Sequence, residues 1–501
     1  MLWMAIFLPR LIGEALGCSD QMADPVAVGN ARAVFYANRP AQALGVHAGL
    51  RRASALALAP ALQWLERQPH QETHALRQLA CWALQFTPTI HLKDPASNTS
   101  TSARSQLGAQ HGLLLEVGPS LRLFGGRRAL LAQLRAGLAE QALSASLACA
   151  PTAHAAWLLA RHRDGLQVDV ADELAASLAP LPLELLEHAG PHLSALASIG
   201  VRTLGDLIAL PRAGLARRFG PALLDELDRS LGLQSEQLSC FEAPVRFEAR
   251  LELLADVVDT NALLHAAQRL LIQFVGWLRA RQAGATGFVL LGKHAELPGS
   301  RFEIRLAEPS RDQARLFGVL RETLATQQLP APVHTLVLHG TGILPLPPES
   351  AALFPMPASA RQELGRLIER LQARLGHAQV QRLCLAADHR PEHAQRLETL
   401  DALPGRRAGG TAAPPVALPR PLWLLAHPRP IPERQGRPWS EGPLSLLAGP
   451  ERIESGWWDE ALVLRDYFIA ADDSGRMFWI YRQRLADPDG RPGWFLHGRF
   501  G

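Results

Sequence analysis

The chain opens with an apolar segment, Met1–Leu8, whose sequence is MLWMAIFL. Pro9 and Arg10 end it after eight residues, whereas a membrane-spanning helix needs about 20. No basic leader and no small-residue cleavage site accompany it, which argues against a secretory signal peptide. So short and apolar a run is typical of a buried strand. We therefore expect Trp3–Leu8 to form a strand inside a mixed α/β fold.

The size and the cysteine pattern limit the class of protein. A length of 501 residues is too great for one hydrophobic core and predicts about three or four domains. The formal net charge is only +4, so any attraction to nucleic acid must come from local patches. The five cysteines form no C-x-x-C pair and have no histidine partner at metal-ligand spacing. We expect a cytoplasmic protein without disulfides, cofactor or metal ion, and without a membrane partner.

Residues 1–165 have the pattern of a mixed α/β domain. Apolar runs predict three strands, at Trp3–Leu8, Val26–Val28 and Ala33–Tyr36. Leucine and alanine spacing predicts three helical stretches, at Ala48–Leu84, Arg127–Leu143 and Thr152–Arg163. Between them, Asp94–Gln110 has the Ser, Thr and Asn content of a surface loop.

Residues 166–238 are expected to be helical in short pieces. Within them, Leu186–Leu207 resembles a helix-hairpin-helix unit, in which a glycine turn presents backbone N–H groups to a phosphate at a helix N-terminus. The turn is degenerate here because Pro191 has no N–H. The residues expected to contact DNA are Gly190, Gly200, Arg202 and Thr203. A purely structural helix pair is the alternative.

Residues 239–345 are expected to alternate strands and helices in the order β-α-β-β-α-β. The segments that carry this pattern are the helices Asn261–Arg281 and Ser310–Gln327 and the strands Gly287–Leu291, Phe302–Leu306 and Thr335–Gly340. Residues 346–403 follow, with a helix expected at Ala360–Leu375 and a strand at Val380–Ala386.

The amino-acid composition changes twice within the last hundred residues. Residues 404–450 are rich in Pro and Gly, so we expect an unfolded linker that buries little apolar surface. Residues 451–501 are rich in aromatic residues, and turn sequences at Asp472–Gly475 and Asp489–Gly490 predict a small antiparallel β meander. The expected strands are Asp466–Ala471, Arg476–Arg484 and Trp494–Leu496.

The paired tryptophans Trp457 and Trp458 precede this meander. Aromatic side chains of so small a sheet are more often core than contact surface, since the sheet needs them for its stability. These two are not needed for the alternation of the strands. We therefore expect them to be exposed anchors for a protein partner.

Three segments of residues 1–165 resemble, in order and spacing, the opening strand, the fingers and a palm strand of the Y-family translesion DNA polymerases. They are Met1–Leu11, Pro25–Pro60 around Asn38–Val46, and Gly112–Gly126. The resemblance implies a palm with fingers over 1–165, a thumb over 166–238 and a DNA-binding little finger over 239–345. The fold class is then α/β and α+β, in several domains, with the small C-terminal β meander added.

The resemblance does not extend to the catalytic acids. Polymerases of this family hold two divalent ions with carboxylates, one in the first strand and a neighbouring pair in the palm. In this chain Phe7, Leu8 and Pro9 stand at the first position, and His111 and Gly112 stand at the pair. We therefore expect no catalytic residue, no metal site and no polymerase activity.

The side chains that grip the nucleotide are also replaced. The family's Asn-Tyr-Glu-Ala-Arg motif becomes Asn-Arg-Pro-Ala-Gln, with Arg39 and Gln42 at the positions of the Tyr and the Arg. Its Ala-Pro-Asn-Lys motif ends in Ala153 in place of the lysine. We expect no nucleotide-binding site at these residues.

Four further motifs resemble the noncatalytic, polymerase-like subunit of a bacterial damage-inducible mutasome: Arg122–Gly126, Asp388–Glu392, Gly449–Trp458 and Trp494–Gly498. The resemblance implies a nucleoid-associated adaptor that binds DNA without sequence preference. Its implied partners are a sliding clamp, a RecA-like protein called ImuA, and an error-prone C-family polymerase α subunit.

A clamp-binding peptide of this kind is a Gln followed by a Leu-Phe pair that fills a hydrophobic pocket. The candidate here consists of Glu349, Leu353 and Phe354, with Glu349 in place of the glutamine. Two apolar anchors on an extended peptide can supply much of a binding energy. The alternative is an apolar pair at a domain edge.

Two other functions remain open. One is a weakly active polymerase that recruits acids from elsewhere, such as Glu14, Asp20 or Glu116. The other is a DNA-binding repair accessory that has no clamp partner.

Overall fold

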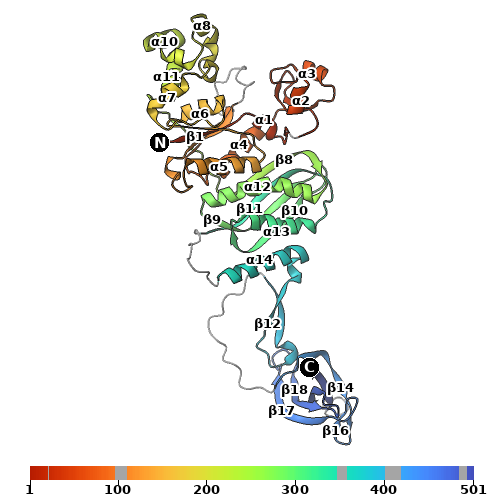
Figure 1. Ribbon diagram of the computed structural model, residues 1–501. Coiled ribbons are helices and arrows are strands. Elements are labelled where there is room, and N and C mark those ends of the chain that lie inside the picture. Colours follow the sequence, from red (N-terminus) through yellow and green to blue (C-terminus); the bar gives the residue numbers. More distant parts are fainter. Residues whose placement is uncertain (21, 96–109, 347–357, 401–418, 485–492) are drawn as a thin grey trace. The chain divides into compact units, whose positions relative to one another are not determined.

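The computed structural model describes residues 1–20, 22–95, 110–346, 358–400, 419–484 and 493–501. The chain divides into two compact units, Met1–Arg374 and Leu375–Gly501. Figure 1 labels many of the elements of both units, and each unit is described here by itself.

The first unit is built around β1 (Trp3–Leu8), as the apolar run predicts. A four-stranded sheet has the order β5-β6-β1-β7, and its other strands are β5 (Ile90–Lys93), β6 (His111–Glu116) and β7 (Ser146–Ala150). Met4 and Ile6 face a core shared with α4 (Pro69–Ala83) and α5 (Arg127–Glu140). Ala5 faces the opposite core, with α6 (Ala153–His162). Helices on both faces explain why the strand is apolar throughout.

A smaller sheet in the order β3-β2-β4 forms the fingers. Its elements are β2 (Val26–Gly29), β3 (Val34–Ala37), β4 (Gln63–Glu66), α1 (Leu11–Glu14), α2 (Arg39–Ala43) and α3 (Arg52–Leu58). The continuous helical stretch expected over Ala48–Leu84 is wrong, because β4 lies between α3 and α4. Pro60 explains the break, since the residue before a proline disfavours the helical conformation and α3 ends at Leu58.

Short helices follow, as expected for residues 166–238. They are α7 (Leu174–Leu178), α8 (Leu193–Ser198), α9 (Leu204–Ile208), α10 (Arg212–Phe219) and α11 (Pro221–Leu231). Their buried leucines join the core beneath α6.

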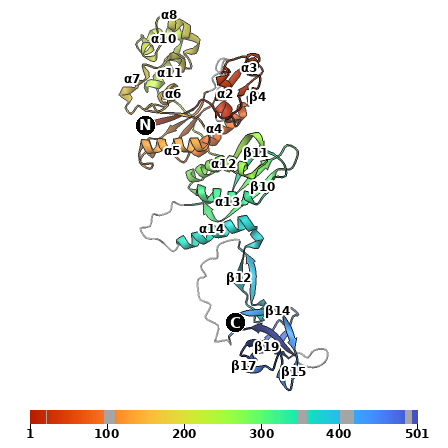
Figure 2. The same cartoon turned by 45° about the vertical axis from the view of Figure 1, so that its right-hand side comes forward.

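The β-α-β-β-α-β order expected next is confirmed. It consists of β8 (Glu248–Val257), α12 (Thr260–Ala280), β9 (Ala283–Lys293), β10 (Ser300–Ser310), α13 (Gln313–Ala325) and β11 (Val333–Pro345), with the sheet order β10-β9-β11-β8. Both helices pack into one core with the sheet (Figure 2). The last helix of the unit, α14 (Ala358–Leu375), is held through Glu369, which pairs with Arg315 of α13 and accepts a hydrogen bond from the Ala307 N–H at 2.7 Å.

The second unit begins with a two-stranded ribbon, β12 (Gln381–Leu385) and β13 (Gln395–Thr399). An antiparallel sheet in the order β14-β20-β19-β18-β17 follows. Its strands are β14 (Trp423–Ile431), β17 (Ser445–Ser455), β18 (Val463–Ala471), β19 (Met477–Gln483) and β20 (Trp494–Arg499), and a small hairpin joins β15 (Glu433–Arg434) to β16 (Arg437–Pro438). The three strands expected in the tail are therefore present, with two more than the pattern indicated. The second expected turn, Asp489–Gly490, lies outside the described residues.

The unfolded linker expected over 404–450 is wrong for its described part, because β14 and the start of β17 are formed there. The prolines are tolerated because both strands are at the edges of the sheet, where a missing N–H costs no ladder bond. Pro428 and Pro430 lie on β14, and Pro450 lies at an irregularity in the pairing of β17. The Pro and Gly content therefore marks edge strands here.

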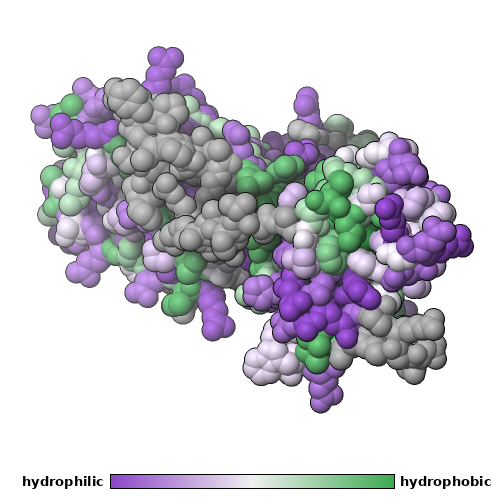
Figure 3. All heavy atoms as spheres, turned by 90° about the horizontal axis from the view of Figure 1, so that it is seen from below, coloured by the Kyte–Doolittle hydropathy of each residue, from purple (hydrophilic) through white to green (hydrophobic). Residues whose placement is uncertain are grey.

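Seen from below, the surface carries small groups of hydrophobic side chains among hydrophilic ones (Figure 3). Within the described ranges, no helix has both the length and the apolar character to cross a membrane.

Candidate functional site

The strand register brings together the residues that we expect at the positions of a polymerase's carboxylates. Phe7 of β1 is opposite Gly112 of β6, and Leu8 is opposite His111. Pro9 follows directly where β1 ends. The pairing therefore brings Phe7, Leu8, Pro9, His111 and Gly112 to the same end of the palm sheet.

An indole fills the space beside Gly112. The side chain of Trp157, on α6, is buried and meets the Phe7 ring edge to face, with ring centroids 5.5 Å apart. A Cβ atom at residue 112 would collide with this indole and with the carbonyl oxygen of Ile6. A glutamate therefore does not fit at this position without moving Trp157.

His111 takes part in a buried ionic network. Its Nε2 is 2.7 Å from Oε2 of Glu72, and both side chains are almost completely buried. Arg67 donates to both oxygens of the same carboxylate at 2.7 Å. On the other side of the ring, Nδ1 is 3.9 Å from Asp94, which accepts a hydrogen bond from Thr73. The carboxylates nearest to the site thus face cations and donors of the protein itself.

The environment of Glu72 keeps it ionised. Burial alone would raise its pKa, but hydrogen bonds from Arg67 and His111 lower the pKa to about 2. Sequence analysis missed Glu72 and Asp94 because they approach His111 only through tertiary folding. A usable signal was the presence of one acid on α4 and another directly after β5, next to the end of β1 where no acid is found.

The acids named as possible substitutes lie elsewhere. Glu116 is four residues along β6 from Gly112, which is about 13 Å at the rise of a strand. Glu14 is buried and accepts a hydrogen bond from the Ser144 N–H at 2.9 Å, and burial raises its pKa. Asp20 pairs with Arg10 and accepts from the Arg39 N–H. Among the described residues, no group of three or more His, Cys, Asp or Glu side chains is arranged to hold a metal ion.

The positions expected to have lost the nucleotide grip are placed as follows. Arg39 begins α2 and its side chain is exposed. Gln42 donates from Nε2 to the carbonyl of Ala37 at 2.7 Å, so its amide is used within the fingers. Ala153 is buried at the start of α6.

The helix-hairpin-helix residues are only partly brought together. Gly200 (φ +84°), Arg202 and Thr203 form the turn before α9, whereas Gly190 belongs to a separate 3-10 turn, Gly190–His192. The N–H groups of Arg202 and Thr203 both donate to Asp206, at 3.0 and 2.9 Å. This capping box uses the donors that the motif would offer to a phosphate. A phosphate contact at this turn would therefore rely on the Arg202 side chain.

The residues expected to bind the clamp and the paired tryptophans remain to be placed. Glu349, Leu353 and Phe354 lie outside the described residues. Trp457 and Trp458 are both exposed, with 77% and 54% of their surface accessible.

Comparisons with known proteins identify the family. Residues 20–161 match the impB/mucB/samB family. Two relatives, each described as Protein ImuB, come from Caulobacter vibrioides strains NA1000 / CB15N and ATCC 19089 / CIP 103742 / CB 15. Each is 30% identical over 475 residues, which covers 91% of this chain and 100% of the relative. The chain belongs to the ImuB family.

Membership in the ImuB family confirms the resemblance seen in the sequence, and the match extends well beyond the residues of the impB/mucB/samB model. Among solved structures, DinB from Sulfolobus solfataricus is similar with a TM-score of 0.38 and 17% identity, over 69% of this chain and 100% of that one. A ternary complex of Dbh gives a TM-score of 0.38, 17% identity and the same coverage.

The ionic network gives a prediction for the substitution Glu72→Gln. It removes a buried carboxylate and leaves Arg67 and His111 without their shared partner, so the free energy of opening the palm sheet should fall by about 3 kcal/mol. Hydrogen exchange of the β1 and β6 amides measures this quantity. Because the pKa of Glu72 is lowered in the folded state, its stabilisation is fully present above about pH 4.5 and is lost as the pH falls towards 2. The variant should lack this acid-dependent loss.

Glu66→Gln is the matched control, because Glu66 is exposed and its oxygen lies 3.6 Å from Arg52. It should change the opening free energy by less than about 0.5 kcal/mol. Equal protection of the β1 and β6 amides in Glu72→Gln and in the native chain, at every pH, would contradict the role given to Glu72.

Proposed function

We propose that this chain is a noncatalytic, DNA-binding adaptor in damage-induced translesion synthesis. The packing of Trp157 against Gly112 and Phe7 is the observation that supports this proposal best. Two-metal phosphoryl transfer requires carboxylates that face both ions, because the repulsion between the ions must be offset. An indole and a phenyl ring supply no ligand for either ion. The palm then acts as a scaffold that carries the DNA-binding and partner-binding segments.

DNA binding is proposed for the little finger. The helices cover one face of its sheet, while Arg301 and Arg305 point away from the core on β10, with 59% and 66% of their side chains exposed. Between them, Glu303 lies 3.1 Å from Arg305 and 3.9 Å from Arg301, so part of this charge is balanced. Such a surface favours modest affinity through phosphates, without base-specific contacts.

The partners proposed are those that the family resemblance implies. They are a sliding clamp bound through Glu349, Leu353 and Phe354, an ImuA-like protein of the RecA family, and an error-prone C-family polymerase α subunit that performs the synthesis. The protein would work in the cytoplasm at the nucleoid, at sites where replication has stopped.

A primer-extension assay tests the noncatalytic assignment. The purified chain, with template, primer, the four deoxynucleotides and either Mg²⁺ or Mn²⁺, should give no template-dependent incorporation, because Phe7, His111 and Gly112 stand at the expected ligand positions and supply no carboxylate. Incorporation that is abolished by Glu14→Gln, Asp20→Asn or Glu116→Gln would establish the alternative, a weakly active polymerase.

Substitution of the exposed arginines tests the DNA surface. Arg301→Ala/Arg305→Ala should weaken binding to duplex DNA roughly tenfold, to a similar degree for all sequences, and should reduce the salt slope of the affinity by about 2. The control is Arg321→Ala, since Arg321 is similarly exposed on α13, away from this face. An unchanged salt slope in the double variant would exclude these arginines from the DNA contact.

Clamp binding separates the adaptor from a repair accessory without a clamp partner. In a pull-down with the purified clamp, Leu353→Ala/Phe354→Ala should lose most of the retained protein, because the pair supplies both apolar anchors. Leu364→Ala, at an exposed leucine of α14, should be retained like the native chain. Equal retention of the native chain and the double variant would remove this peptide from the proposal.

A further inference from the structure

The loop Gly456–Ala461, between β17 and β18, places two large aromatic side chains in solvent. The rings of Trp457 and Trp458 meet edge to face, with centroids 5.4 Å apart. Both rings are more than half exposed, although other tryptophans of the same unit, such as Trp479, are buried. Exposed aromatic pairs with a polar rim are typical of protein contact sites.

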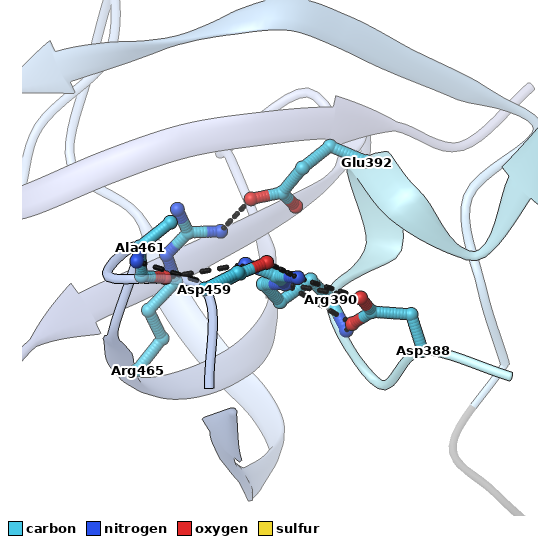
Figure 4. Close-up of polar contacts among 6 residues, drawn as sticks. All are labelled: Asp388, Arg390, Glu392, Asp459, Ala461 and Arg465. Atoms are coloured by element: carbon cyan, nitrogen blue, oxygen red, sulfur yellow. Dashed lines mark hydrogen bonds and ion pairs between the residues drawn. The ribbon is translucent and has the colours of Figure 1, made fainter. Parts of the chain in front are cut away.

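A buried arginine lies beneath this loop. Arg390 follows the ribbon strand β12 and has only 3% of its surface exposed. Its guanidinium donates to both oxygens of Asp388, with the shortest distance 2.7 Å, and to both oxygens of Asp459, at 3.0 and 2.5 Å (Figure 4). It also donates to the carbonyl of Ala461 at 3.3 Å and lies 5.6 Å from the ring centroid of Trp458.

The backbone of the loop packs closely against the Arg390 guanidinium at Gly456 and Ala461. Gly456 has φ +84°, and a Cβ atom there would approach Nη1 of Arg390 to 2.7 Å and collide with the carbonyl oxygen of Ala461. Beside it, Arg465 of β18 donates to Glu392 at 2.8 Å (Figure 4). The segment Asp388–Glu392 is thus tied to the sheet at two points. Two sequence motifs that lie far apart along the chain form one local structure.

The ion pairs persist at neutral pH. Hydrogen bonding to Arg390 lowers the pKa of Asp388 to about 2 and also lowers the pKa of Asp459. The same bonds raise the pKa of the Arg390 guanidinium, so the three groups stay charged. The loop is then held by interactions that need no partner to form.

The charge around the tryptophans limits what can bind them. Asp459 and Glu460 are exposed in the same loop, while the positive charge of Arg390 is covered. The loop itself, from Gly456 to Ala461, contains no basic residue. Aromatic platforms for single-stranded nucleic acid combine stacking with a basic groove, which this loop does not offer. Because two carboxylates, Asp388 and Asp459, share the single charge of Arg390, and Glu460 adds another, the loop is negative on balance. A partner with an apolar side chain beside a Lys or Arg matches both the rings and this charge.

We propose that the Trp457–Trp458 loop is a preformed docking site for a short segment of a partner protein, with an apolar side chain next to a Lys or Arg, and that Arg390 is the positioning residue that holds it. This inference rests on the proposed adaptor function, because it gives the chemistry of one of the partner contacts. A loop fixed before binding loses less conformational freedom on association, which strengthens the complex.

The test uses the full chain and two purified probes, the ImuA-like protein and the C-family polymerase α subunit. Trp457→Ala/Trp458→Ala should weaken binding to one of these probes roughly 30-fold, the range of a central aromatic anchor. The matched control is Trp423→Ala, because Trp423 is 70% exposed on β14 of the same unit. It should bind like the native chain.

Charge and positioning are tested separately. Glu460→Gln should weaken the complex and make its affinity less sensitive to salt, because one of the exposed carboxylates is removed. Arg390→Lys keeps the charge but lacks the planar fork that binds two carboxylates. Asp459→Asn keeps the Arg390–Asp388 pair, and therefore serves as the second variant if Arg390→Lys fails to fold. In whichever variant folds, far-UV circular dichroism should be unchanged, tryptophan quenching by acrylamide should increase, and affinity should fall roughly tenfold.

The outcomes distinguish this inference from the proposed function. If the native chain binds neither probe, the adaptor function is overturned and the inference with it. If the native chain binds but the double tryptophan variant binds equally well, the inference alone is wrong. It is also wrong if the double substitution leaves both protein affinities unchanged and instead weakens binding to oligothymidine, or abolishes self-association of the chain.

Discussion

The contact of Trp157 with Gly112 and Phe7 is the constraint on which the palm depends. It fills one end of the sheet with apolar side chains, at the positions where we expect the carboxylates of a polymerase. On the next residue of the same strand, the His111 ring meets Glu72, whose carboxylate already binds Arg67. The carboxylate that lies nearest to His111 among the described residues is therefore already paired with donors of the protein itself.

Much of the scaffold was predictable from local sequence. An unbroken apolar run and helical periodicity identified β1, α5 and α6, the family resemblance indicated β6, and the little-finger order followed from longer helices and strands. The polar network was not predictable in this way, because Glu72 and His111 are 39 residues apart and meet only when α4 packs on the sheet. The short strands β4 and β7 were missed because, unlike the equally short β2 and β3, they contain no β-branched residue to mark them as strands.

The helix-hairpin-helix motif shows a different limit. The glycine spacing was recognised, but the Thr203–Asp206 capping box competes for the same N–H groups that a phosphate would need. That competition was visible in the sequence as a threonine followed by an acid three residues later. A prediction of phosphate binding must therefore consider acidic side chains in the first turn of the helix as well as the glycine spacing. The Pro-rich segment before β17 was wrongly expected to be an unfolded linker for a related reason. Its composition alone does not show that these prolines lie on edge strands, where no ladder hydrogen bond is lost.

The prolines on the edge strands β14 and β17 affect how copies of the C-terminal sheet can associate. An antiparallel sheet with open edges can grow by adding a strand from another molecule, which leads to aggregation. Both outer strands of the C-terminal sheet carry prolines, whose missing donors interrupt such growth at either margin. Copies of this module are therefore less prone to associate with one another through their strand edges, even at high local concentration.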